Sequence, residues 1–323
     1  MSPPLRALIV SYAFPPVGGA GVQRVLKLVK YLPSYRVTST VLTVENPSVP
    51  VRDESLERDI PERTEILRTP TLEPSYSSKQ LAWSAAAELR PGLFARGKKK
   101  LVNVGRQLLV PDPQVLWLPS AGFALARRLT SSTADDVVFI SGPPFSQFLL
   151  AAVGRLRPRT ALVLDYRDEW TTTGRVYEMG GSVHAGARLE RAILHLAHAV
   201  TTATDAFRSE LLARFDFLDP NRVHTVPNGY DPDDFPTPLP RPTADRFVLT
   251  YVGTVFRLTS ARGFLDAVRL LHAREPELGK LLEVRFIGRI VETEACYFEG
   301  TSALGVRRLG YLEHAEALAE LAR

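Results

Sequence analysis

The stretch formed by residues 5–32 constrains the fold more than any other part of the chain, because it joins a short apolar run to an amphipathic helix through a glycine-rich turn. The run at 8–10 is bounded by turn residues, which is typical of a strand buried in a parallel sheet. Prolines and glycines at 14–21 end this strand. Apolar residues then recur at helical spacing over 22–32. The sequence therefore predicts a strand, a turn and a helix in direct succession.

The glycines of this turn, Gly18, Gly19 and Gly21, are candidates for contact with a ligand. A helix that begins at such a turn presents free backbone amides and the positive end of its dipole, which suit a phosphate or a sugar hydroxyl. Glycine-rich turns between a strand and a helix also recur in α/β folds without a ligand, so a purely structural role is the alternative.

A second alternative for this turn is the dinucleotide site of an NAD(P)-dependent oxidoreductase. Residues 19–24 nearly match the pattern G-x-G-x-x-G, and Glu45 follows the next predicted strand at 40–44. Arg24 occupies the third glycine position, however, where close packing of the helix on the strand calls for Gly or Ala. We therefore rank the oxidoreductase second.

Strands and helices alternate along the first 230 residues, whereas residues 45–80 are rich in proline and charge and are expected to be irregular. This alternation predicts a doubly wound parallel sheet, which binds ligands beyond the carboxyl ends of its strands. Beyond the two strands already named, apolar runs predict strands at 137–140, 161–164, 200–202 and 223–226, and helical spacing predicts helices at 121–129, 145–156, 185–197 and 205–214.

Polar residues follow two of these strands directly. Ser141 comes after the strand at 137–140, and residues 165–170, with the sequence Asp-Tyr-Arg-Asp-Glu-Trp, follow the strand at 161–164. The carboxyl ends of parallel strands share one edge of a sheet, so we expect these side chains at the ligand-binding edge. A salt-bridged helix start is the structural alternative.

A second α/β unit follows a linker at 231–245 that is rich in proline and aspartate. Its three predicted strands are fewer than the roughly 4–6 of an ordinary sheet, and the chain ends within a helical pattern. We therefore expect a second domain that is incomplete in this chain, as in a C-terminally truncated sequence. The predicted strands are 247–252, 282–287 and 306–309, and the predicted helices are 262–272, 293–304 and 315–323.

The composition limits the partners and the compartment. The chain has 40 Lys and Arg against 35 Asp and Glu, a net charge of +5, which favours anionic partners. Basic residues are not interleaved with aromatic residues on strands, so we predict no nucleic-acid partner. The single cysteine, Cys296, excludes an intramolecular disulfide and indicates a reducing compartment. No signal-peptide core and no apolar run of ~18–20 residues is present, which predicts a cytoplasmic location.

The segment 81–110 interleaves basic residues with apolar ones. A segment of this kind can lie on an anionic membrane surface, which would make the protein peripheral on the inner face of the plasma membrane. A solvated helical insertion is the alternative, because charge runs usually mark exposed faces.

Several of these features together resemble the retaining nucleotide-sugar glycosyltransferases of family 4, which have the GT-B fold. The resemblance rests on the glycine turn, on the sequence Val-Pro-Asn-Gly-Tyr-Asp at 226–231 and on Gly253 after a strand. Residues 165–170 are similar to the Asp-x-Arg-Asp-x-Trp segment of one branch. The resemblance implies two Rossmann-like doubly wound domains, an acceptor-binding domain at 1–230 and a partial nucleotide-sugar-binding domain at 246–323.

The resemblance also implies a reaction. The sugar of a nucleotide diphospho-sugar donor would move to a polysaccharide or lipid-linked acceptor with retention of configuration, and neither a cofactor nor a bound metal would be needed. Positive side chains and helix N-termini would then stabilise the leaving diphosphate.

For the donor, the resemblance places Gly253 beneath the diphosphate and Gly288 near the base. Arg262 stands where the family usually has a lysine, and arginine can also bind phosphate, with a different geometry. Arg289 and Ile290 depart from the usual Gly-x-Gly beside the base. The donor or phosphate residues implied in this way are Gly18, Gly19, Gly21, Gly253, Arg257, Arg262 and Gly288.

For the reaction and the acceptor, the resemblance implies Asp168, Arg167 and Asp165 as catalytic residues and Ser141 and Trp170 as acceptor-binding residues. A carboxylate and a guanidinium at this strand end could orient the hydroxyls of the acceptor and the sugar.

The Glu-x7-Glu motif that holds the donor sugar in this family would lie beyond Arg323. Glu313, Glu316 and Glu320 precede that position, and we do not assign them this role. A non-catalytic nucleotide-sugar-binding protein is the alternative if the chain truly ends at Arg323.

Overall fold

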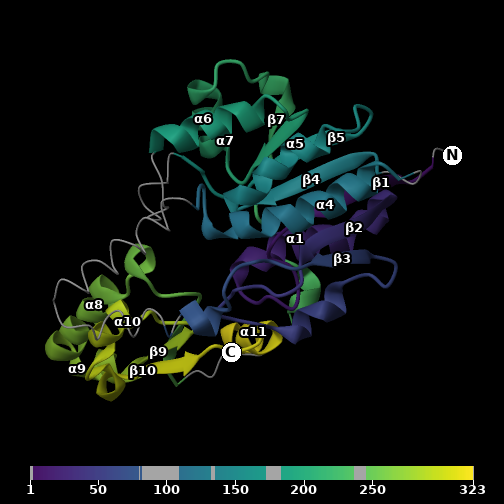
Figure 1. The fold of residues 1–323 in the computed structure, drawn as a ribbon. Helices are drawn as coiled ribbons and strands as arrows, with labels where there is room; N and C mark the ends of the chain where they lie inside the picture. Colours follow the sequence, from purple (N-terminus) through teal and green to yellow (C-terminus); the bar gives the residue numbers. More distant parts are fainter. Residues whose placement is uncertain are drawn as a thin grey trace. The chain divides into compact units, whose positions relative to one another are not determined.

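The computed structural model describes residues 3–79, 81, 109–131, 135–171, 183–235 and 245–322. The chain divides into two compact units, each of which contains a parallel sheet (Figure 1). The predicted α/β class with two parallel sheets is thereby confirmed. The first unit holds Met1–Val17, Gly21–Arg52 and Glu57–Gly229, and the second holds Gly18–Ala20, Asp53–Leu56 and Tyr230–Arg323.

The sheet of the first unit has seven parallel strands in the order β3-β2-β1-β4-β5-β6-β7. From β1 the strands are added on one side as far as β3. The chain then returns to the other side of β1, where β4 to β7 are added in turn. The topology is therefore doubly wound, and the switch point lies between β1 and β4. The strands are β1 (Leu5–Val10), β2 (Val37–Val44), β3 (Glu65–Thr69), β4 (Val137–Gly142), β5 (Ala161–Tyr166), β6 (Ala199–Thr202) and β7 (Val223–Thr225).

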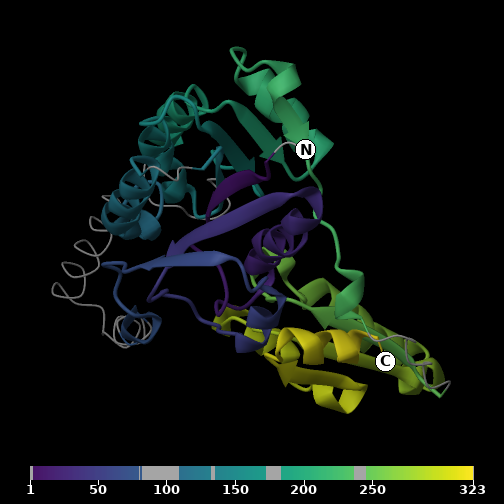
Figure 2. The ribbon, with the colours of Figure 1, turned by 90° about the vertical axis from the view of Figure 1, so that its right-hand side faces the viewer.

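Helices lie on both faces of this sheet (Figure 2). Leu8 and Val10 of β1 belong to one core cluster with α4 (Leu118–Leu129). The intervening Ile9 points to the opposite face, because side chains alternate along a strand. On that side lies α1 (Ala20–Tyr31), which buries a stripe of valines and leucine at helical spacing. The other helices are α5 (Ala151–Gly154), α6 (Val183–Leu194) and α7 (Asp205–Arg214).

Two predictions for this unit are wrong. The segment expected to be irregular contains β3, which pairs with β2. The helix expected at 145–156 is a 3-10 helix at Phe145–Leu150 followed by the single turn of α5. The tighter start has a local cause, because the Asp112 carboxylate accepts hydrogen bonds from the amides of Phe145 and Ser146, at 2.7 and 2.9 Å.

The second unit has a three-stranded parallel sheet in the order β10-β9-β8. Its apolar core forms where α8 packs on this sheet. The helix predicted at 293–304 is broken into short turns, because Glu299 has an extended backbone and Gly300 has a left-handed one, with a φ of 71°. The elements are β8 (Phe247–Val252), α8 (Arg262–Arg274), α9 (Pro276–Leu281), β9 (Leu282–Ile287), α10 (Glu292–Ala295), β10 (Val306–Gly310) and α11 (His314–Leu321).

No helix in the described part of the chain is long and apolar enough to cross a membrane. Within the segment 81–110, for which a solvated helical insertion and a contact with an anionic membrane surface are the two interpretations, all residues except 81, 109 and 110 lie outside the described part.

Candidate functional site

A buried carboxylate organises the carboxyl ends of three neighbouring strands in the first unit. The register places Asp165 of β5 opposite Ser141 of β4 and Thr201 of β6. Both hydroxyls donate to the carboxylate at 2.7 Å. Arg24 of α1 donates from Nε at 3.0 Å and from Nη2 at 2.7 Å. Asp165 is 0% exposed, so these four hydrogen bonds take the place of water around its charge.

Arg24 reaches a further part of the chain with its remaining nitrogen. Its Nη1 donates to the carbonyl oxygens of Val226 and Pro227, at 2.8 and 3.3 Å, and to Oδ1 of Asn228 at 3.2 Å. The side chain is 13% exposed. This guanidinium therefore joins α1, the end of β5 and the segment after β7.

Arg167 lies just beyond β5 and holds two turns. Its Nη1 donates to the carbonyl oxygen of Gly21, and its Nη2 donates to the carbonyl oxygen of Pro143. Nε is buried and has no hydrogen-bond partner in the described part of the protein. Burial lowers the pKa of Arg167, although the carboxylates of Asp165 and Asp168 favour the charged form.

The other candidates of the first unit divide into one exposed and two buried side chains. Asp168 is exposed, and partial burial of its carboxyl raises its pKa even though Arg167 lowers it. Ser141 is fully buried against Asp165. Trp170 is 3% exposed and its ring stacks on Phe145, with centroids 5.3 Å apart. Of these three, only Asp168 can meet a ligand directly.

The glycine turn leads into α1 as the sequence predicts. Gly19 and Gly21 are exposed and Gly18 is half-buried. Gly19 has a φ of 93°, a conformation that L side chains rarely adopt. The amides of the first turn of α1 are not bonded within the helix, because no turn precedes them.

In the second unit, glycines follow or end all three strands. The Gly253 amide donates to the carbonyl oxygen of Ile287 at 2.9 Å, and the Gly288 amide donates to that of Gly310 at 2.6 Å. Gly253 and Gly288 have φ values of 157° and 119°. The predicted donor glycines therefore lie side by side at the carboxyl edge of β8 and β9.

The two predicted cations of this unit are exposed. Arg262 opens α8, its side chain is 67% exposed, and its Nε lies 3.9 Å from Oδ2 of Asp266. Its guanidinium also lies 5.6 Å from the centre of the Tyr297 ring. Arg257 belongs to the short 3-10 helix Arg257–Thr259 after β8. Charge at the start of α8 can act together with the positive end of that helix.

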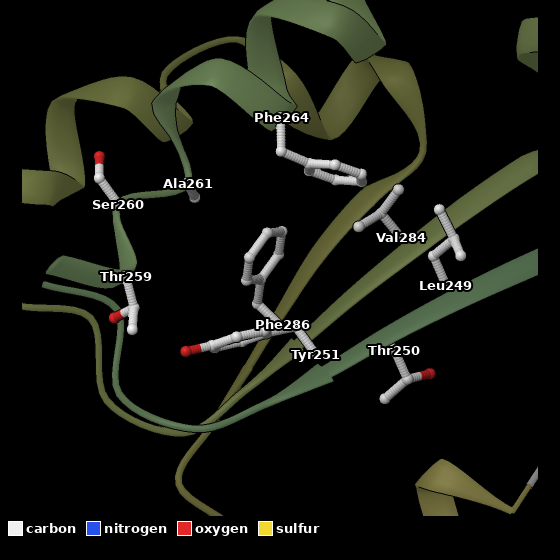
Figure 3. A pocket seen from close by; sticks show the side chains of 9 residues that line it. All are labelled: Leu249, Thr250, Tyr251, Thr259, Ser260, Ala261, Phe264, Val284 and Phe286. Carbon is white, nitrogen blue, oxygen red and sulfur yellow. The ribbon is translucent and has the colours of Figure 1, made fainter. Parts of the chain in front are cut away.

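A cavity of about 340 Å³ lies on the face of β8 and β9 near the start of α8 (Figure 3). Its wall is mainly apolar, with the rings of Tyr251, Phe264 and Phe286 around it. None of the predicted donor residues lines this cavity. The donor prediction therefore depends on the strand ends and the start of α8, and not on this cavity.

Sequence reasoning missed Arg24 as a site residue. It stood out only as a misfit in a dinucleotide pattern, and its partner Asp165 is 141 residues away. Charge complementarity between a basic residue in the first turns of a helix and an acid at a strand end was the one signal that could have indicated the pair.

The family model of the glycosyl transferase 4-like domain matches residues 19–229, which are more than half of the chain. The chain therefore belongs to the glycosyl transferase 4-like family. An alpha-maltose-1-phosphate synthase of Mycolicibacterium smegmatis (strain ATCC 700084 / mc(2)155) is 29% identical over 114 residues, which are 32% of this chain and 29% of that protein. This match spans less than a third of the length of the relative.

Solved structures share the GT-B fold with this chain. The catalytic domain of starch synthase IV from Arabidopsis thaliana, bound to ADP and acarbose, has a TM-score of 0.59 at 11% identity and matches 99% of this chain and 77% of that one. Anabaena HepE in complex with UDP and glucose has a TM-score of 0.53 at 14% identity, with 97% and 71% covered. At these identities the likeness shows the fold alone. The predicted GT-B fold is confirmed, and the oxidoreductase alternative is not favoured.

Proposed function

We propose that this protein is a retaining glycosyltransferase that moves a sugar from a nucleotide diphospho-sugar to a polysaccharide or lipid-linked acceptor. The observation that carries the proposal is the family match over residues 19–229. The nucleotides bound by two proteins of the same fold, UDP in HepE and ADP in starch synthase IV, support a nucleotide diphospho-sugar as donor.

The second unit supplies the donor site in this proposal. Gly253 and Gly288 allow the diphosphate and the base to approach the backbone closely, because neither residue has a side chain. Arg262, Arg257 and the start of α8 stabilise the negative charge that develops on the leaving diphosphate. These fixed positive groups take the place of a metal ion, so we expect transfer to continue in the presence of a chelator.

The first unit supplies the acceptor site. Gly21 and the residues after it open α1 in this unit and offer backbone amides to a hydroxyl or a phosphate, and the exposed carboxylate of Asp168 accepts a hydrogen bond from the acceptor hydroxyl. A raised pKa makes this carboxylate a better proton acceptor. Asp165, Ser141 and Trp170 hold the strand end in place and do not touch the substrate.

The test begins with binding. We expect UDP, GDP or ADP to raise the melting temperature of the protein, and Arg262→Ala to remove most of that shift. Arg274→Ala is the matched control, because it removes an exposed arginine from the opposite end of the same helix. Equal shifts in both variants would remove Arg262 from the donor site. No shift with any nucleotide, together with no turnover of sugar nucleotides, would contradict the proposed function.

Retention is tested on the product. The anomeric configuration of the new glycosidic bond, measured by NMR, should equal that of the donor sugar. An inverted product would exclude the retaining mechanism and leave the glycosyl transfer itself in place.

A further inference from the structure

We propose that Arg24 is a positioning residue that holds three segments of the first unit in one arrangement: the start of α1, the carboxyl end of β5 and residues 226–228. The proposal rests on the proposed function only in one respect, namely that this arrangement would serve sugar transfer. The contacts themselves are independent of any substrate.

The first step of the argument is the pair formed with Asp165. Nε and Nη2 of Arg24 bind its two carboxylate oxygens, at 3.0 and 2.7 Å. Ser141 and Thr201 occupy the same oxygens from the neighbouring strands. Because the carboxylate is fully buried and already fixed by these strands, it dictates the plane of the guanidinium.

The second step is the use of the remaining nitrogen. With the plane of the guanidinium fixed, Nη1 points at the carbonyl oxygens of Val226 and Pro227 and at the Asn228 side chain. These residues follow β7, and Gly229 is the last residue of the first unit before the chain enters the second. Arg24 therefore fixes the point at which the chain leaves this unit.

The third step is a contact in the opposite direction, from the end of β5 to the start of α1. Arg167, which follows β5, donates to the carbonyl oxygen of Gly21 in the first turn of α1. The start of α1 is thus tied to the end of β5 from both directions, by Arg24 from the helix and by Arg167 from the strand. This double tie sets Gly21 at the start of α1 in relation to Asp168, the neighbour of Arg167 in the sequence.

Only a planar fork can hold all of these partners. A lysine at position 24 would keep the positive charge and one contact with Asp165, but its single ammonium group cannot bind a carboxylate in bidentate fashion and also reach residues 226–228. The conservative variant Arg24→Lys should therefore keep a contact with Asp165 and lose the contacts with residues 226–228. A general loss of stability would weaken both sets of contacts.

Hydrogen–deuterium exchange tests the proposal without any nucleotide. The Val226 amide donates to the carbonyl oxygen of Thr202 at 2.9 Å and so reports on the segment after β7. In Arg24→Lys we expect exchange in a peptide covering 222–230 to rise about tenfold, since a hydrogen bond to a charged group is lost, and exchange in 20–27 to stay close to wild type. In Arg24→Gln both peptides should exchange faster.

Arg128→Lys is the matched control, because Arg128 of α4 also binds a carboxylate with two nitrogens, from Nε at 2.9 Å and from Nη2 at 3.2 Å to Asp135. Its other partners, Glu65 and Thr40, lie on β3 and β2. It should leave exchange in 222–230 unchanged. Wild-type exchange there in Arg24→Lys, or the same increase in Arg128→Lys, would overturn the proposal. If Arg24→Gln does not fold, the comparison of Arg24→Lys with Arg128→Lys decides alone. Failure here would leave the proposed transfer untouched, and absence of transfer would leave this arrangement untouched.

Discussion

Gly288 lies so close to Gly253 that a Cβ atom added to Gly288 would be 2.2 Å from the Gly253 carbonyl oxygen. Real Cβ contacts are essentially never shorter than 3.0 Å. Gly288 also has a φ of 119°, where any L side chain is strained. The turn after β9 can therefore approach the turn after β8 only without a side chain at this position.

Gly288→Ala should lower the free energy of unfolding by more than about 2 kcal/mol, because strain and a backbone clash add together. Gly263→Ala is the control: no atom lies within 4 Å of an added Cβ, and Gly263 is part of α8. That change should stabilise the protein by about 0.5–1 kcal/mol. Urea unfolding measures both, and equal effects of the two substitutions would contradict this account of the turn.

The two neighbouring carboxylates of the first unit should respond differently to removal of their charge. Asp165→Asn leaves the partly buried Arg24 without its counter-ion and should cost about 3 kcal/mol or more. Asp168→Asn changes an exposed side chain and should cost less than about 1 kcal/mol, but it should strongly reduce sugar transfer. Urea unfolding and turnover of a sugar nucleotide distinguish the two. Full transfer by Asp168→Asn would remove Asp168 from the reaction.

The sequence predicted the sheet well where strands are buried and apolar, and poorly where they are not. The run at 137–140 reveals β4 because no polar residue interrupts it. β3 is an edge strand that carries Glu65 and Arg68, and both charged side chains reach partners outside the sheet. Its sequence pattern therefore looks like that of a surface loop. The strand forms because it pairs with β2, and the local sequence does not show this pairing.

For the candidate site, residue type and position at a strand end could be predicted, but the orientation of side chains could not. Asp165 and Asp168 look equivalent in the sequence, yet one is buried and accepts hydrogen bonds from three residues, whereas the other is exposed. The difference depends on the register of β4, β5 and β6 and on Arg24, which comes from a distant part of the chain. No local pattern carries that information.

Stability should depend on pH through Glu190 of α6, which is 2% exposed. Burial raises its pKa from 4.5 to about 7, although a hydrogen bond from Thr171 lowers it. Because the folded state holds the proton more tightly than the unfolded state, this contribution is fully present below pH 4.5 and is lost as pH rises to about 7. Glu190→Gln should therefore gain stability relative to wild type between pH 5 and pH 8, by on the order of 3 kcal/mol.

Unfolding free energies of the two proteins across this pH range measure the effect, because other titrating groups cancel in the difference. Glu210→Gln, an exposed change on α7, should keep the pH dependence of the wild type. A constant difference between Glu190→Gln and wild type would show that Glu190 titrates alike in both states.

The segment 81–110 leads to a prediction that rests on charge alone. Lys98, Lys99 and Lys100 stand together among apolar residues, and each basic group near an anionic surface contributes about 1 kcal/mol of attraction. Replacing all three with Glu should therefore reduce binding to vesicles rich in phosphatidylserine by at least about 100-fold, measured by co-sedimentation. Vesicles of neutral lipid should bind neither protein, and added salt should weaken wild-type binding. Equal sedimentation of the two proteins with anionic vesicles would mean that this lysine cluster faces water and that the segment is a solvated insertion.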